Sequence, residues 1–292
     1  NSDISIDEVT HALERLPNGK APGTEAAPSE CYKYAKTQGD PRADPPIPPV
    51  NRVAPVLEVL FNRIWRAQDG DESFPEQFTT TVLTPIYKRK GDVKTPGNYR
   101  GIAVGGALAK CYASILLNRL ARAGELFKWR HPAQAGFRRK YGTAHHLFVL
   151  RHLVTKHTRA GAPPMIVVQI DFEKAFDKVP RPLLWLRLRE KGVSGRLLEA
   201  IQAAYEKVMM TVKADGKLSA AFEATQGVKQ GCPLSTELFG LFIETLAEYI
   251  DAHEDWLDTA STAGTPELNG KKLSLLMYAD DVSLLATTPE RM

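Results

Sequence analysis

The sequence predicts a mixed α/β chain of the α+β kind, in which the strands form an antiparallel sheet. Three features of the 292 residues indicate this class. Segments with helical periodicity alternate with short β-branched runs, several of these runs are nearly all apolar, and 43% of the residues are hydrophobic. A chain of this length and content can build a substantial core in one large domain or two small ones.

Residues 1–79 are predicted to form a helical extension. Ser5 and Glu8 have the spacing of a capping box that opens a helix, and an apolar stripe predicts another helix over 53–65. Between the two helices, the proline-rich stretch 37–50 is typical of an exposed linker or of an insertion.

Residues 80–160 are predicted to begin with two strands and to continue with helices. The strands, 80–87 and 99–104, are joined by a lysine-rich loop. The helices are expected over 108–121 and 143–159. In the second helix, the spacing predicts that Leu147, Leu150 and Val154 point inward.

Residues 161–292 are predicted to supply the rest of the sheet. Apolar strands are expected over 165–170, 273–277 and 282–286, and a hairpin is expected with arms 208–213 and 218–224. Helices are expected over 183–191, 195–205 and 235–251. Ser235 is the predicted N-cap of the last helix.

Two adjacent carboxylates, Asp280 and Asp281, stand between the last two apolar runs. The flanking strands predict that both lie in a tight hairpin turn beside a core, where two like charges repel unless they share a cation. Hard oxygen ligands of this kind suit Mg²⁺. The alternative is a solvated turn, in which Asp is favoured for its backbone chemistry.

A third carboxylate, Asp171, directly follows the strand 165–170. Beside the hairpin in one sheet, this strand end would bring three carboxylates to one edge, which is the layout that a two-metal phosphoryl-transfer site requires. The alternative for Asp171 is the N-cap of a helix.

Positive charge is concentrated in one part of the chain. Residues 86–140 carry thirteen Lys or Arg against two acids, and because the whole chain is +4, the remainder carries −7. A basic block beside an acidic remainder indicates a phosphate-tracking surface joined to a metal-binding centre. The alternative is an ordinary solvated charged face.

A set of short motifs occurs in one order along the chain. They are PIYKRKGD at 85–92, NYRGI at 98–102, QAGFR at 134–138, DFEKAFD at 171–177, QGVKQGCPLS at 226–235 and YADD at 278–281, after weaker matches at 21–25 and 31–33. This ordered set resembles the polymerase domain of reverse transcriptases of the non-LTR (LINE-like) retrotransposon type. The resemblance covers nearly the whole chain, although Glu25 stands where relatives generally have Asp.

The resemblance implies a metal-dependent centre with Asp171, Asp280 and Asp281 as the catalytic residues. Asp171 and Asp280 would bridge two Mg²⁺ ions, with Asp281 beside them and the Phe172 carbonyl as a further ligand, and Mn²⁺ could replace Mg²⁺. In such polymerases the primer 3′-hydroxyl attacks the α-phosphate of a deoxynucleoside triphosphate. One ion activates the hydroxyl and the other neutralises the leaving pyrophosphate.

The resemblance also implies which residues bind the incoming nucleotide. Lys88, Lys90 and Arg100 are candidates to hold the triphosphate, Arg100 above all because its planar fork matches phosphate oxygens. Gln230 and Gly231 resemble the family loop that lies against the nucleotide, where a glycine allows the backbone to approach closely.

Further residues are implied at the sugar, the primer and the template. Phe176 matches the aromatic gate that excludes a ribose 2′-hydroxyl, and its alternative is an ordinary core position. Tyr278 resembles the residue that packs near the primer end. Arg138, Arg139 and Lys140, at the end of the basic block, are candidates to bind template and primer phosphates.

The implied fold is the right-hand fold of polymerases, with fingers over 80–160 and a palm, interleaved with them, over 161–292. We expect the chain to stop before the thumb and to be a segment of a longer protein. The implied function is an RNA-directed DNA polymerase of a retroelement that uses an RNA template, a DNA primer and deoxynucleoside triphosphates. The alternatives are a catalytically incomplete nucleic-acid-binding remnant of such an element and an RNA-dependent RNA polymerase.

The cysteines and the hydropathy of the sequence indicate the compartment in which the protein is expected. Three cysteines far apart in the sequence predict neither a disulfide framework nor a zinc site, which fits an intracellular protein of the nucleus or the cytoplasm. The sequence contains no secretory pattern at its start and no apolar run of about 18 residues. We therefore expect no membrane partner, and the oligomeric state stays open.

Overall fold

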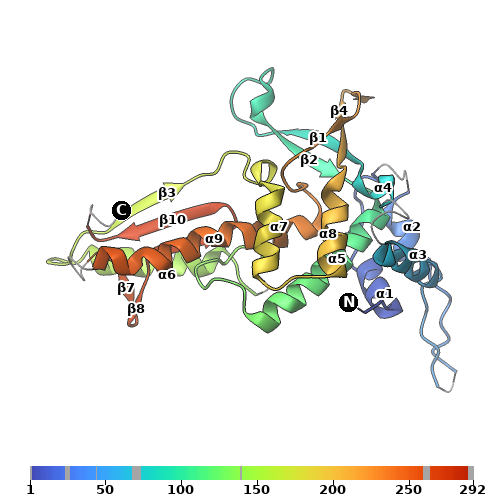
Figure 1. The fold of residues 1–292 in the computed structure, drawn as a ribbon, viewed down its shortest axis with the longest axis horizontal. Coiled ribbons are helices and arrows are strands. Elements are labelled where there is room, and N and C mark those ends of the chain that lie inside the picture. The colour runs from blue at the N-terminus through green and yellow to red at the C-terminus, as the bar shows by residue number, and fades with distance from the viewer. Residues whose placement is uncertain are drawn as a thin grey trace. The chain divides into compact units, whose positions relative to one another are not determined.

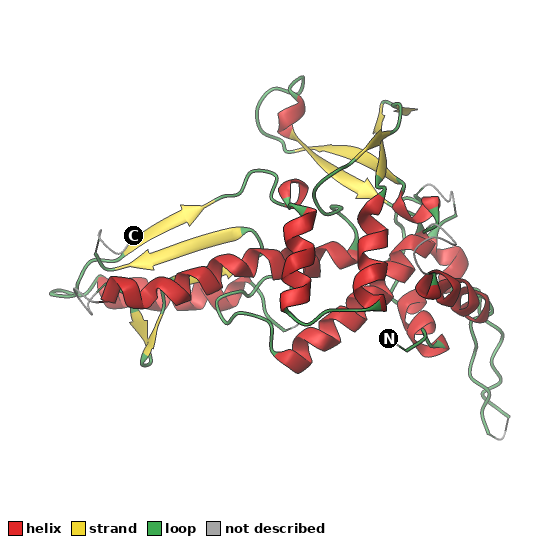
Figure 2. Cartoon of the chain, viewed as in Figure 1, coloured by secondary structure: helices red, strands yellow, loops and turns green. Residues whose placement is uncertain are grey.

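The computed structural model describes residues 2–23, 27–43, 45–67, 74–138, 140–258 and 264–288 (Figure 1). The chain divides into two compact units, and each combines two separate stretches of sequence. Unit 1 comprises Asn1–Ala123 and Pro180–Ser235, and unit 2 comprises Gly124–Val179 and Thr236–Met292. Helices and strands occur in both units, which confirms the predicted mixed α/β class (Figure 2).

The helices of unit 1 form around an aromatic core. They are α1 (Ile6–Glu14), α2 (Ser29–Lys33), α3 (Ala54–Arg66), α4 (Glu76–Thr79), the start of α5 (Ala107–Phe127), α7 (Arg181–Glu190) and α8 (Arg196–Glu206). The ring of Phe61 on α3 lies 5.4 Å from Tyr112 on α5 and 6.3 Å from Phe78 on α4. Aromatic rings bury large apolar areas, so this cluster ties three helices together.

The predicted capping box at the start of α1 is confirmed. The backbone amide of Glu8 donates to Ser5 Oγ, and the amide of Ser5 donates to the Glu8 carboxylate. The predicted apolar stripe of α3 is only partly buried, because Leu57 and Trp65 face the core whereas Val56 is exposed.

The proline-rich stretch, described over 37–43 and 45–50, is mostly exposed and folds back on itself. Antiparallel bridges join Lys36 to Asn51 and Asp40 to Ile47. Its two ends therefore lie together, as in an inserted loop.

The sheet of unit 1 has the strand order β2-β1-β4-β5, and β6 also pairs with β4. The strands are β1 (Thr81–Tyr87), β2 (Tyr99–Val104), β4 (Met209–Ala214), β5 (Lys217–Leu218) and β6 (Phe222–Glu223), and the short η1 (Pro96–Asn98) precedes β2. Both hairpins that the sequence predicted, β1 with β2 and β4 with β5, are confirmed. The parallel pairing of β1 with β4, which joins them into one sheet, was not predicted.

Unit 2 is built on a three-stranded antiparallel sheet with the order β3-β10-β9. Its elements are α6 (Thr143–His157), β3 (Ile166–Ile170), η2 (Phe176–Lys178), most of α9 (Pro233–Asp258), β7 (Glu267–Leu268), β8 (Lys271–Lys272), β9 (Leu275–Tyr278) and β10 (Asp281–Ala286). In Figure 1, β3 and β10 run in opposite directions. The predicted antiparallel sheet is therefore present.

Helix α6 covers this sheet with a face that differs from the predicted one. Leu153 is fully buried against β9 and β10, and Leu150 packs beside it. Leu147 and Val154, which we predicted to point inward, are 63% and 42% exposed. At 100° per residue, they lie on the flank of Leu150 that faces away from Leu153, so the buried stripe is rotated from the expected one.

Ser235 does not cap α9, because the helix begins two residues earlier, at Pro233. Proline suits a first helical turn, since it has no amide hydrogen to leave unpaired. The Ser235 hydroxyl instead makes a 2.7 Å hydrogen bond with the Tyr205 hydroxyl inside unit 1. None of the helices in the described ranges is long and apolar enough to cross a membrane.

Candidate functional site

The register of the unit 2 sheet brings the predicted carboxylates to one end of adjacent strands. Ile170, the last residue of β3, pairs with Val282 of β10, so Asp171 and Asp281 follow at the same end. Asp281 in turn pairs with Tyr278 of β9, and only Ala279 and Asp280 form the turn between them. Strand pairing thus does what the sequence predicted and gathers all three aspartates at one edge.

The chemistry of these carboxylates fits a hard divalent cation. Asp171 and Asp281 are exposed and Asp280 is partly buried. Within the described ranges, none of the three carboxylates makes an ion pair or a side-chain hydrogen bond, so their oxygens are available. The described His, Cys, Asp and Glu side chains include no group of three that could enclose a metal ion by itself. Mg²⁺ suits such an open set, because it usually takes one or two carboxylates and completes its shell with water and phosphate oxygens.

The hairpin turn is supported from outside the sheet by the segment 133–136, which carries part of the QAGFR motif. The Ala135 amide donates to the Met277 carbonyl at 2.9 Å, and the Met277 amide donates to the Ala133 carbonyl at 2.8 Å. This segment therefore covers the open edge of β9, an edge that would otherwise present unpaired backbone groups. The motif was noticed in the sequence, but its contact with the hairpin was not predicted.

Phe176 lies in η2 within a small aromatic cluster of unit 2. Its ring stacks on Phe239 of α9 at 4.4 Å and meets Phe137 edge-on at 6.2 Å. Phe239 is buried, whereas Phe176 is only partly buried. One side of the Phe176 ring is thus fixed by packing, as a gate would require and as a core position would also allow. Phe172, the other phenylalanine near Asp171, is partly buried as well.

The residues predicted to hold a triphosphate lie on the β1–β2 hairpin of unit 1. Lys88, Lys90 and Arg100 are all exposed. The Lys88 ammonium donates to the Gly97 carbonyl at 3.0 Å, and the Tyr99 hydroxyl donates to the Val93 carbonyl at 2.8 Å, so the loop between the strands is internally ordered. Lys88 is therefore partly used within its own loop.

The loop with Gln230 and Gly231 lies directly against β2. The Ala103 amide donates to the Gln230 carbonyl at 2.8 Å. Gly231 has a φ of +105°, and a Cβ at this position would stand 2.8 Å from the Ala103 carbonyl oxygen. Only glycine fits at this position. The sequence predicted a close approach of this backbone to the nucleotide, whereas the approach that the structure shows is to Ala103 of strand β2, three residues beyond Arg100.

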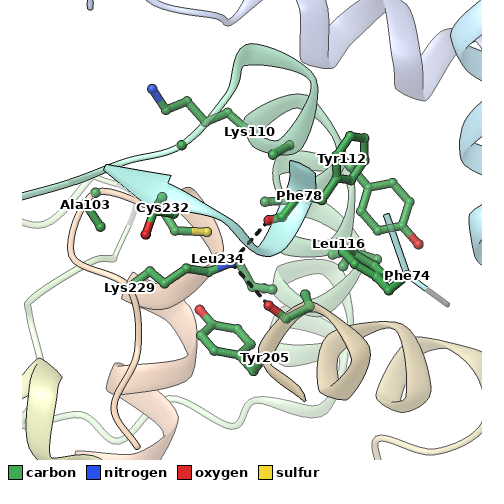
Figure 3. Close-up of a pocket in the computed structure, with 16 residues that line it drawn as sticks. Phe74, Phe78, Ala103, Lys110, Tyr112, Leu116, Tyr205, Lys229, Cys232 and Leu234 are labelled. Carbon is green, nitrogen blue, oxygen red and sulfur yellow. Dashed lines mark hydrogen bonds between the residues drawn. The ribbon is translucent and has the colours of Figure 1, made fainter. Parts of the chain in front are cut away.

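A small apolar pocket of about 30 Å³ lies behind this loop in unit 1 (Figure 3). Lys229 reaches into it beside Tyr205, and its ammonium donates to the Ala204 carbonyl at 3.1 Å near the end of α8. Burial lowers the pKa of Lys229, the nearby Cys232 opposes this shift, and Arg181 adds to it. The sequence motif contained Lys229, but its role as an anchor of the Gln230 loop was not predicted.

Of the residues predicted to bind primer and template, Arg138 has a clear structural role. Its guanidinium donates to the Gln134 carbonyl at 3.2 Å and lies 4.2 Å from the centre of the Tyr141 ring. Lys140 is exposed and Tyr278 is partly buried. Arg139 lies outside the described residues.

Part of the basic block is used inside the fold. Arg119 pairs with Glu8 at 2.7 Å in unit 1. In unit 2, Arg130 pairs with Glu237 at 2.5 Å and with the fully buried Glu244 at 2.9 Å. The positive charge that faces solvent is thus smaller than the sequence count suggests.

Comparison with known proteins identifies the family of the chain. The chain matches a family model described as reverse transcriptase (RNA-dependent DNA polymerase) over residues 87–292. The Retrovirus-related Pol polyprotein from type-1 retrotransposable element R2 of Popillia japonica is 29% identical over 211 residues, which are 70% of this chain and 27% of that protein. The RNA-directed DNA polymerase from mobile element jockey of Drosophila melanogaster is 22% identical over 289 residues, which are 97% of this chain and 27% of that protein.

Among solved structures, telomerase from Candida Tropicalis, in complex with a fragment of telomeric RNA, has a TM-score of 0.48 and 14% identity, over 74% of this chain and 37% of that chain. The chain spans between 17% and 27% of the length of four of its curated relatives.

The family match covers well over half of the chain and includes all three carboxylates that the β3–β10 register brings to one edge. The resemblance to reverse transcriptases of non-LTR retrotransposons is therefore confirmed. The chain belongs to the reverse transcriptase (RNA-dependent DNA polymerase) family.

Proposed function

We propose that this chain is the catalytic domain of an RNA-directed DNA polymerase encoded by a non-LTR retrotransposon. Its reaction is attack by a primer 3′-hydroxyl on the α-phosphate of a deoxynucleoside triphosphate, directed by an RNA template. The observation that carries the proposal is the placement of Asp171, Asp280 and Asp281 at one end of adjacent strands, in a chain of the reverse transcriptase family.

In this proposal, Asp171, Asp280 and Asp281 would hold the Mg²⁺ ions, with the Phe172 carbonyl as a further ligand, and Mn²⁺ could replace Mg²⁺. When bound, such ions activate the attacking hydroxyl and neutralise the charge that develops on the leaving phosphates. The contribution of the chain is to hold the carboxylates on two hydrogen-bonded strands, so that little reorganisation is needed during the reaction.

Most of the nucleotide-binding roles are assigned to residues of unit 1. Arg100 and Lys90 bind the triphosphate, and Lys88 orders the loop and contributes its charge in part. Gln230 and Gly231, in the loop that packs beside β2, lie against the incoming nucleotide. In unit 2, Phe176 rejects the ribose 2′-hydroxyl.

Binding of the primer and the template is assigned to the remaining basic and aromatic residues. Tyr278 packs near the primer end, and Arg138, Arg139 and Lys140 bind backbone phosphates of the RNA template and DNA primer. We assign residues 80–160 to the fingers and residues 161–292 to the palm of the polymerase fold, after an extension over 1–79.

Primer extension by the full-length protein tests this function through Phe176. Replacing Phe176 by Val should keep DNA synthesis on an RNA template and should relax selection of deoxy- over ribonucleotides by about tenfold or more, because shape-based exclusion in a pocket is typically of that size. The ratio of kcat/KM for the two nucleotides measures it.

The control for Phe176 is Phe137→Leu, which removes the other ring of the edge-on contact without placing a β-branched residue at the positive φ of this position. This variant should keep the selection of the parent protein. Equal relaxation in both variants would assign Phe176 to core packing, and absence of template-directed DNA synthesis by the parent would contradict the proposed function.

Salt dependence tests the phosphate-binding surface. Replacing Lys90 and Lys140 by Ala should weaken binding of a primer-template across all sequences and reduce the slope of log affinity against log salt by about 1.4 to 1.8, since each phosphate contact contributes about 0.7 to 0.9. Fluorescence anisotropy over a salt series measures this slope.

Lys20 and Lys217 are exposed lysines outside the basic block and provide the matched control. Their replacement by Ala should leave the slope unchanged. Weakening that depends on the template sequence would instead indicate base readout at Lys90 or Lys140.

A further inference from the structure

The turn that carries Asp280 has an unfavourable backbone conformation. Ala279, its first residue, has a φ of +59°, in the left-handed region that residues with a Cβ rarely adopt. The favoured two-residue hairpin turns have a positive φ at their first position, which glycine, asparagine or aspartate usually supplies. Here alanine occupies the position, so contacts from elsewhere in unit 2 must stabilise the turn.

The side chain of Gln134 makes these contacts. The Ala279 amide donates to Gln134 Oε1 at 2.9 Å, and Gln134 Nε2 donates to the Ala279 carbonyl at 3.1 Å. The two bonds are reciprocal, so one side-chain amide satisfies both backbone groups of the strained residue. Gln134 Oε1 also accepts from the Gly136 amide at 2.7 Å, and the whole residue is 0% exposed.

The backbone around Gln134 is shaped to fit the turn. A Cβ on Gly136 would stand 2.1 Å from the Ala279 nitrogen, so only glycine permits this approach. The neighbouring Met277 amide donates to the Ala133 carbonyl, and the Met277 carbonyl accepts from the Ala135 amide. Gln134 is therefore fixed on both sides by backbone bonds to the same hairpin.

We infer that Gln134 is a positioning residue, which fixes the Ala279 backbone and thereby the direction in which Asp280 presents its carboxylate to a divalent metal ion. This inference rests on the proposed function, in which Asp280 is a metal ligand. A buried hydrogen bond to a flexible turn limits the orientations of the next side chain, and loss of such outer contacts commonly lowers metal affinity about 10- to 100-fold.

The test uses Gln134→Met, which fills the same buried space and cannot form the three hydrogen bonds. The control is Gln169→Met, because the exposed Gln169 on β3 accepts a 2.9 Å hydrogen bond from Ser283 on β10, away from the turn. Two quantities are measured in the full-length protein: Mn²⁺ affinity by electron paramagnetic resonance, and hydrogen exchange of the Ala279 amide by nuclear magnetic resonance.

We expect Gln134→Met to weaken Mn²⁺ binding about tenfold or more and to speed exchange of the Ala279 amide, whereas Gln169→Met changes neither by more than about twofold. Unchanged Mn²⁺ affinity in Gln134→Met would overturn the inference. Equal losses in Gln134→Met and Gln169→Met would also overturn it, since a general loosening of the sheet would then be the cause.

Two further measurements complete the test. In the parent protein, the Ala279 amide must be protected from exchange, and an unprotected amide would overturn the inference even where the variants do not fold. Asp280→Asn must itself weaken Mn²⁺ binding. If it does not, the proposed metal site is wrong, whereas a loss in Asp280→Asn without a loss in Gln134→Met contradicts only the role of Gln134.

Discussion

Replacing Asp280 by Asn should reduce DNA synthesis by the full-length protein by at least about 10²-fold, the size of loss seen when one electrostatic contact to a transition state is removed. Asparagine has nearly the same shape as aspartate, so the turn between β9 and β10 should form as before. It lacks the negative charge, and the proposed metal ions lose a shared ligand. Steady-state primer extension at saturating primer-template measures the loss.

The matched control is Asp215→Asn, which changes an exposed aspartate in the turn between β4 and β5 of unit 1. DNA synthesis should be unchanged in this variant, and Asp280→Asn should still bind primer-template. Retention of more than about a tenth of the activity in Asp280→Asn would contradict the assignment of Asp280 as a shared metal ligand.

Replacing Arg130 by Met should lower the free energy of unfolding of unit 2 by about 3–5 kcal/mol, the range for breaking a buried ion pair by removing one partner. Arg130 bonds to Glu237 and to Glu244, and Glu244 is fully buried. Methionine fills part of the space but leaves both carboxylates without a cation. Urea unfolding, followed by a signal from Trp129 of unit 2, measures the change.

The loss should depend on pH in a defined direction. Burial raises the pKa of Glu244, and Arg130 only partly opposes that shift. A carboxyl group whose pKa is higher in the folded than in the unfolded protein binds its proton more tightly in the folded state. The free energy of unfolding therefore rises as the pH falls from above the folded-state pKa to below the unfolded-state pKa. Removing Arg130 raises this pKa further, and the deficit of the variant should be smaller at about pH 5.5 than at about pH 8.

Lys178→Met is the control for Arg130, because Lys178 and Glu173 form an exposed ion pair of 3.7 Å in the same unit. Exposed pairs contribute only about 0–1 kcal/mol, since water and salt screen them. A loss in Arg130→Met no larger than in Lys178→Met would show that the buried network is not important for stability.

The carboxylate edge could be predicted from the sequence because its determinants are local. The apolar runs before Asp171 and around Asp280 specify strands, and strands of that kind pair in a sheet. The support given by Gln134 could not be predicted, since it depends on a contact between residues 145 positions apart in sequence. The parallel pairing of β1 with β4 is nonlocal in the same way.

The buried face of α6 and the solvent exposure of the basic block were predicted wrongly, because the residue types in a segment do not specify which of its side chains are buried. The apolar residues of α6 are compatible with more than one buried face, and only packing against β9 and β10 selects the face of Leu153. A charge count treats the basic block as solvent-facing, but Arg130 is paired with Glu237 and Glu244, which lie far away in the sequence. Charge counts contain no information on such pairing, and the roles of Lys90, Arg100 and Lys140 remain predictions.

The assembly of each unit from two distant stretches has a consequence for biosynthesis. The β3 strand, with Ile170 at its end, is translated more than a hundred residues before its partner Val282 on β10. At ribosomal rates of about 5–20 residues per second, that strand waits on the order of ten seconds with an open edge. Pairings across such distances also form slowly. A nascent chain of this protein should therefore expose the unpaired edge of β3 until the YADD hairpin has emerged from the ribosome.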